Sequence, residues 1–106
     1  MKVNFSEVIN NLQGSPIQVP DGEKTKDCTL AYVAAEALLA FDPQVKESGE
    51  TKAKSYALAV RLVKGGEQEV SAEDIVLLKN KIGDTFAPAV VGPCFELLEQ
   101  RAIGEA

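Results

Sequence analysis

Hydrophobic residues recur at helical spacing through most of the chain after residue 28. The clearest stretch begins at Thr29, a suitable N-cap, and ends at Asp42, because a residue that precedes proline avoids helical backbone. Apolar side chains cover most of its circumference, so we expect this helix to form the buried centre of the fold. The positions expected to face inward are Leu30, Val33, Ala34, Ala37, Leu38 and Phe41.

A second helix is predicted between Ser48, which can act as N-cap, and the glycine pair at 65–66, which would end it. Its spacing repeats the pattern of an amphipathic helix with one apolar stripe. The inner face that this pattern predicts consists of Tyr56, Ala59, Val60 and Val63.

The third helix has the strongest local signature. Ser71 at the N-cap and Asp74 three residues later match a capping box, with Val70 and Ile75 placed to form a hydrophobic staple. We expect the helix to end at Gly83. Its inner face would consist of Ile75, Leu78 and Ile82.

The stretch FAPAVVGPCFELLEQ, residues 86–100, predicts a last helix capped by Asp84 or Thr85. Pro93 either kinks this helix or opens a shorter one after Gly92. Val91, Cys94 and Leu98 are expected to face the core. Three further large apolar residues do not fit the same inward face, and they either form an interaction surface or are buried by a kink at Pro93. They are Phe86, Val90 and Phe95.

The first 27 residues are polar and rich in turn formers. KVNF and PIQV have strand-like composition and are separated by NNLQGS, which favours a turn, while VPDGEKTKD is expected to be a loop. We therefore predict a mainly α fold: about four helices with a short N-terminal β-hairpin or extended arm. The chain would be a single domain, residues 1–106, with the hairpin or arm in 1–27 and the helical part in 28–101.

The composition is that of a folded domain, and its net charge disfavours some classes of binding partner. The 106 residues are 45% hydrophobic and 25% charged, with a net charge of −5. Negative charge argues against bulk attraction to nucleic acid or to an anionic membrane. No apolar run is long enough to span a bilayer, and the N-terminus lacks the apolar core of a signal peptide. Two distant cysteines, Cys28 and Cys94, fit reduced thiols in a cytoplasm.

The residues that usually carry catalysis are missing. The chain has no histidine, so no Ser-His-Asp or Cys-His pair can form, and two cysteines without histidine do not make an ordinary zinc site. No glycine-rich phosphate loop is present. We therefore predict no enzyme activity, no catalytic residues, no metal and no cofactor.

Basic residues near the second helix allow an alternative function. A basic face there would suit a small nucleic-acid-associated regulator, although few aromatic residues are interleaved with it. An acidic protein more often carries such residues on a solvated face. The residues are Lys52, Lys54, Arg61 and Lys64.

Several stretches together resemble a known kind of protein. TLAYVAAEALLA, SGETKAKSYALAVRLVKGG, VSAEDIVLLKNKIG and APAVVGPCFELLEQ, in this order, are similar to small uncharacterised proteins encoded in tailed-phage and prophage genomes. The resemblance covers about the last three quarters of the chain and consists of caps, turns and core positions. It implies the cytoplasm of a bacterial host. The function expected is that of a non-enzymatic phage accessory protein that contacts a phage or host protein, or another copy of itself, in virion assembly or host-factor binding.

Overall fold

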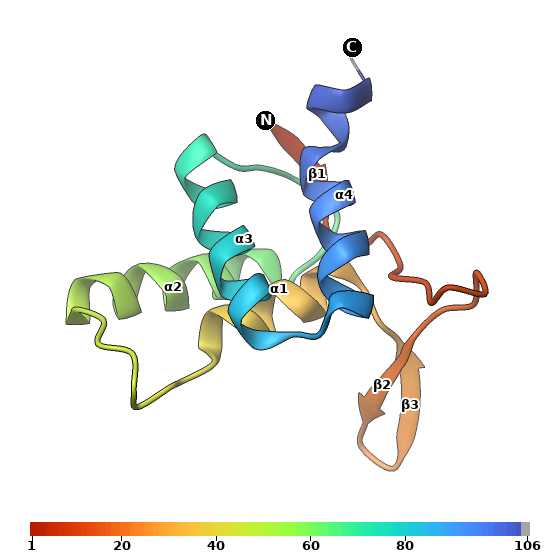
Figure 1. The fold of residues 1–106 in the computed structure, drawn as a ribbon, viewed down its shortest axis with the longest axis horizontal. Helices are drawn as coiled ribbons and strands as arrows, with labels where there is room; N and C mark the ends of the chain where they lie inside the picture. The colour runs from red at the N-terminus through yellow and green to blue at the C-terminus, as the bar shows by residue number, and fades with distance from the viewer. Residues whose placement is uncertain (105–106) are drawn as a thin grey trace.

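Four helices and two small antiparallel sheets make up the structure (Figure 1). The computed structural model describes residues 1–104 and the side chains of residues 1–99, so residues 105–106 of the predicted domain lie outside the described residues. In chain order the elements are β1 (Lys2–Asn4), β2 (Gln18–Asp21), β3 (Lys24–Asp27), α1 (Leu30–Leu39), α2 (Gly49–Leu62), β4 (Glu67–Glu69), α3 (Ala72–Thr85) and α4 (Pro88–Gly104).

Helix α1 begins as predicted and ends earlier than predicted. The Thr29 hydroxyl accepts the backbone N–H of Tyr32 at 3.2 Å, which caps the helix. The chain leaves the helix at Ala40, and the Asp42 carboxylate then accepts the N–H of Gln44 at 2.9 Å in a local turn that competes with helical bonding. Phe41, predicted to face inward, is exposed as a result.

Helix α2 has the predicted N-cap but a different inner face. The Ser48 hydroxyl accepts the N–H of Thr51 at 3.1 Å. Of the predicted inner residues only Ala59 is buried. The real inner face is a stripe one residue earlier, so the helix is turned by about 100° from the prediction. The buried residues are Ser55, Leu58, Ala59 and Leu62, whereas Tyr56, Val60 and Val63 are exposed.

The capping box of α3 is confirmed. The Ser71 hydroxyl accepts the N–H of Asp74, and the Asp74 carboxylate accepts the N–H of Ser71, both at 3.1 Å. The predicted inner face of Ile75, Leu78 and Ile82 is buried.

The boundary between α3 and α4 differs from the prediction. Helix α3 continues past Gly83 to Thr85, so the predicted caps Asp84 and Thr85 belong to α3. Helix α4 begins at Pro88, where a missing N–H costs no hydrogen bond, and it continues through Pro93. Neither a helix start at Pro93 nor a break there is seen.

The N-terminal segment pairs differently from the predicted hairpin. β1 lies antiparallel to β4, with Val3 opposite Gln68, so KVNF pairs with a strand more than 60 residues away and not with PIQV. The N-terminal hairpin is instead β2–β3, formed by the end of the strand-like PIQV and the following stretch predicted to be a loop, and it projects from the helical part in Figure 1. Asp21 pairs with Lys24 across a two-residue turn whose first residue, Gly22, has φ 65°.

A single hydrophobic core joins the two parts of the chain. Helix α1 packs against both α2 and α3, and α3 packs against α4. Phe5 and Ile9 are fully buried in the same cluster as Leu30, Leu78 and Leu98. Residues 1–27 therefore include essential core positions and are not only an arm on a helical domain.

Candidate protein-docking groove

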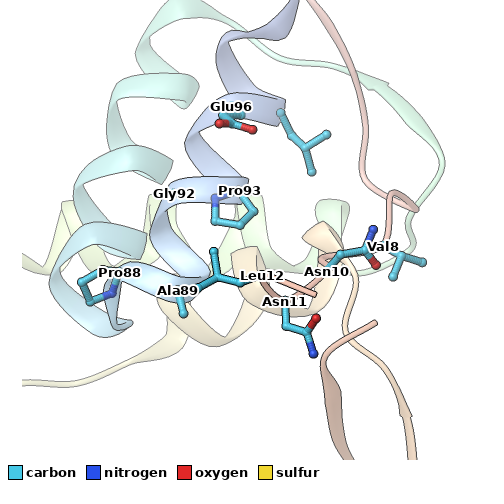
Figure 2. Close-up of a pocket in the computed structure, with 10 residues that line it drawn as sticks. Val8, Asn10, Asn11, Leu12, Pro88, Ala89, Gly92, Pro93 and Glu96 are labelled. Carbon is cyan, nitrogen blue, oxygen red and sulfur yellow. The ribbon is translucent and has the colours of Figure 1, made fainter. Parts of the chain in front are cut away.

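A groove of about 850 Å³ separates an N-terminal loop from one face of α4. Figure 2 shows its side chains, from the loop on one side and from α4 on the other. Apolar groups dominate its lining, with two amides and one carboxylate among them. The lining residues are Val8, Asn10, Asn11, Leu12, Pro88, Ala89, Gly92, Pro93, Glu96 and Leu97.

The loop wall is held by its own hydrogen bonds. The Asn11 side-chain oxygen accepts the backbone N–H groups of Gln13 and Ser15, both at 3.0 Å. The Asn11 N–H donates to the Ser15 carbonyl at 2.8 Å, and the Gly14 N–H donates to the Asn11 carbonyl at 3.0 Å. Together these bonds form a closed turn around Leu12, whose side chain is 97% exposed. An exposed leucine on an ordered turn is the kind of feature that marks a contact surface.

The loop is also tied to the core behind it. The Ile9 N–H donates to the Cys28 carbonyl at 2.8 Å, and the Ile17 N–H donates to the Ile9 carbonyl at 2.9 Å. Ile9 is buried between these bonds. The base of the loop is thus fixed on both sides of the turn that carries Leu12.

The opposite wall is the outer face of α4. Pro88 and Ala89 lie in the first turn, and Pro93 lies about one turn later on the same side. Because Pro93 has no N–H, the carbonyl of Ala89, four residues earlier, lacks its usual helical donor. Ala89 is exposed and lines the groove.

None of the three predicted interaction residues lines this groove: Phe86 precedes α4, and Val90 and Phe95 lie on the helix. Phe86, Val90 and Phe95 are half-buried and pack against the core. The Phe95 ring has Lys79 of α3 over it, with Nζ 5.1 Å from the ring centre, and Lys79 also pairs with Glu99 at 2.6 Å. Phe95 is therefore a contact between α3 and α4.

The core side of α4 follows the prediction at two of three positions. Cys94 and Leu98 are fully buried, and Val91 is half-buried. Within residues 88–99, the exposed apolar positions of α4 are Pro88 and Ala89, which sequence reasoning did not select. A signal was present in Leu12, a large apolar residue between turn formers, but the sequence does not show that it lies beside α4.

The basic residues of the second helix do not gather on one side. Lys52 lines a groove beside the α1–α2 loop, whereas Lys54 and Arg61 line a groove between α2 and α3. Lys54 lies 3.9 Å from Glu50, and Arg61 lies 3.4 Å from Asp74 and donates to the Glu69 carbonyl. Lys64 follows the end of the helix.

Both cysteines are buried free thiols. Burial, with a smaller contribution from the nearby Cys28 thiol, raises the pKa of Cys94 to about 12. Burial also raises the pKa of Cys28. Both groups stay protonated near neutral pH, which disfavours nucleophilic chemistry at either thiol.

Across the described residues, no three His, Cys, Asp or Glu side chains lie close enough together to hold a metal ion. None of the helices in residues 1–104 combines the length and apolarity needed to cross a bilayer.

Comparison with known proteins adds no relative. The chain matches no protein-family model, no curated protein and no solved structure.

Proposed function

We propose that this protein is a non-enzymatic accessory protein that acts by binding another protein at the groove between Leu12 and α4. The observation that carries the proposal is the almost fully exposed Leu12, held by a hydrogen-bonded turn beside an open apolar helix face. Displaying a leucine in this way costs solvation free energy that a bound partner would recover.

The groove suits a short extended segment of the partner. Leu12, Pro93 and Leu97 offer apolar contacts, and the Glu96 carboxylate offers an acceptor. An extended chain brings backbone N–H donors and alternating apolar side chains to such a surface. A few polar groups in a mainly apolar groove would fix the register of the bound segment.

The setting proposed for this activity is the cytoplasm of a bacterial host during phage growth. Its support is the sequence resemblance to proteins of tailed phages and prophages. The partner would then be a phage protein, as in virion assembly, or a host factor. The position of the gene among structural or early genes would distinguish these two.

Site-specific crosslinking tests the groove. A photoreactive phenylalanine analogue replaces Leu12 in one variant and Leu39, another exposed leucine, in the matched control. Expressed in the phage-infected or lysogenic host, the position-12 variant should crosslink one defined protein, identified by mass spectrometry, and the position-39 variant should not. When Ala89→Glu, on the opposite wall of the groove, is added to the position-12 variant, that crosslink should be lost.

Two kinds of outcome would count against the proposal. Equal crosslinking at positions 12 and 39, or no crosslink at position 12, would remove the groove as a docking site. A gel shift that depends steeply on salt and is lost on substituting Lys54 and Arg61, but not Leu12, would favour the nucleic-acid regulator instead. A crosslinked homodimer would support the groove and identify the partner as a second copy.

A further inference from the structure

Helix α2 carries a second apolar stripe on the side that faces away from the core. Tyr56, Val60 and Val63 are 63%, 45% and 57% exposed, and their spacing of four and three residues puts them on one face. The buried face of the same helix is formed by Leu58, Leu62 and their neighbours. Apolar residues on an exposed helix face have no role in the fold described above. We call Tyr56, Val60 and Val63 the α2 stripe.

The α2 stripe is bracketed by two lysines. Lys52 lies one turn before Tyr56, and its Nζ stands 5.5 Å from the ring centre of the exposed Phe41, which extends the apolar surface. Lys64 follows Val63 at the other end. Lys64 lies two residues beyond the end of α2 at Leu62, and the ten residues from Lys52 to Leu62 rise by about 15 Å.

The segment that carries the α2 stripe has a charge opposite to that of the rest of the chain. Residues 51–66 hold four of the 11 basic residues and none of the 16 acidic ones. The rest of the chain therefore has seven basic and 16 acidic residues, a net charge of −9. Among the side chains of residues 1–99, no carboxylate lies within ion-pair distance of Lys52 or Lys64, whereas Lys54 and Arg61 each have one.

We propose that the α2 stripe binds an acidic amphipathic helix of a partner protein. Such a helix would place its apolar face on the α2 stripe and its carboxylates against Lys52 and Lys64. Figure 1 shows α2 at the edge of the molecule away from the N-terminal loop. The site is therefore separate from the groove at Leu12, and the two sites together would let the protein bridge two partners.

Charge decides between this occupant and two others. In an in-register pairing of two copies, antiparallel α2 helices would set Lys52 against Lys64, and parallel ones would set each lysine against itself, so like charges meet either way. An anionic membrane would attract the two lysines but would repel the −9 carried by the rest of the chain. An acidic helix carries its negative charge only where it contacts Lys52 and Lys64, so it gains their attraction without meeting the acidic rest of the chain.

A designed peptide provides the probe. It is a labelled helix of about 18 residues with leucines along one face and glutamates at both ends, so that either orientation matches both lysines. Binding is followed by fluorescence anisotropy. The double charge reversal Lys52→Glu with Lys64→Glu, and separately Val60→Glu, should each weaken binding by about tenfold or more.

The control is Val76→Glu, which changes a similarly exposed valine, 58% accessible, on α3. It should leave peptide affinity within about twofold, a difference too small to reflect a lost contact. Circular dichroism verifies the fold of each variant, and the lysine double variant keeps the test valid if Val60→Glu does not fold. Leu12→Asp should also leave peptide binding intact, because the groove and the α2 stripe are separate sites.

The proposal is overturned if the wild-type protein shows no saturable binding, or if a scrambled peptide of the same composition binds equally well. The proposal is also overturned if Val76→Glu loses peptide binding, or if the lysine double variant still binds the peptide as the wild type does. Vesicles of phosphatidylglycerol and phosphatidylcholine serve as the alternative probe. Binding to these vesicles in place of the peptide would assign the stripe to a membrane surface.

Discussion

Cys94 shows how burial determines the chemistry of a single residue in this protein. Its side chain is fully buried in the core of α4, and burial raises the pKa of its thiol from 9.0 to about 12. A thiolate would have to form without water around it, which disfavours the charged form. The residue thus acts as a small apolar side chain, and the free energy of unfolding depends on whether its thiol is protonated.

The linkage predicts how stability changes in alkali. Below pH 9 the thiol is protonated in both states, and its contribution to stability is fully present. Between about pH 9 and 12 the unfolded chain releases this proton and the folded chain keeps it, so the free energy of unfolding falls by up to about 1.4 kcal/mol per pH unit. Urea titrations across this range should show a smaller decline for Cys94→Ala than for the wild type.

The comparison of slopes matters more than absolute stability, because Cys94→Ala also removes core volume. Cys28 remains in the variant and titrates in the same direction, since burial raises its pKa as well. Some decline with pH is therefore expected in both proteins. Equal slopes in the two proteins would show that Cys94 ionises as easily when folded as when unfolded.

At the scale of the element, helix starts were predictable because capping is local. Thr29, Ser48 and Ser71 each accept an N–H from a residue three positions later. The side chain and the group that it caps lie within one turn, so sequence spacing alone carries the information. These three predicted N-caps are confirmed for this reason, whereas the predicted caps of the last helix, Asp84 or Thr85, belong to α3.

Helix faces and helix ends depend more on distant residues. In α2, the stripes through Leu58 and Val60 have equally good helical spacing, and packing against α1 selected the one through Leu58. Gly83 could have ended α3, but the helix continues, and a Cβ added at Gly83 would lie 3.8 Å from Cζ of the Phe95 ring of α4. Periodicity identifies a helix, and only its neighbours decide which side is buried.

Pro93 inside α4 leads to a prediction at the same scale. Proline in a helix interior costs about 3 kcal/mol relative to alanine. Pro93→Ala restores an N–H donor for the Ala89 carbonyl, but it also gives up about 1 kcal/mol of chain stiffness and a similar amount of ring packing. We expect a net gain in the free energy of unfolding of roughly 1 kcal/mol, measured by denaturant titration.

Pro88→Ala is the matched control for this substitution. Pro88 occupies the first helical position, where no N–H donor is needed and its fixed φ favours the helix. Replacing it should lower stability by up to about 1 kcal/mol, opposite in sign to the change at Pro93. If both substitutions destabilise equally, the Pro93 ring contributes more through packing than the helix loses in hydrogen bonding.

At the scale of the whole molecule, the groove could not be predicted from sequence. Its walls come from residues 8–12 and 88–97, which lie about 80 positions apart. Local rules identify a turn around NNLQGS and a helix after Pro88, but not that they face each other. The same limit explains β1, whose partner β4 follows α2 and is not the next strand-like segment.

The shared core also determines how the chain should unfold. The N-terminal ammonium group pairs with Glu69 at 2.9 Å, the Val70 N–H donates to the Met1 carbonyl, and the Phe5 N–H donates to the Gly66 carbonyl. Phe5 also accepts, through its carbonyl, the N–H of Ala31 in α1. The first residues thus connect the turn after α2 with the start of α1. We expect residues 1–27 and the helices to unfold together.

Phe5→Ala tests this cooperativity. Phe5 has no exposed surface, and removing its ring should cost about 3–5 kcal/mol of global stability. Because one core is shared, amide hydrogen exchange in α3 and α4 should accelerate by the factor that this loss implies, although neither helix has been altered. Leu12→Ala, a change of similar kind at an exposed position of the same segment, should leave exchange in both helices unchanged. Faster exchange confined to β1 and its neighbours in Phe5→Ala would instead mean that the N-terminal segment is a separable arm, and that α1, α3 and α4 hold together without it.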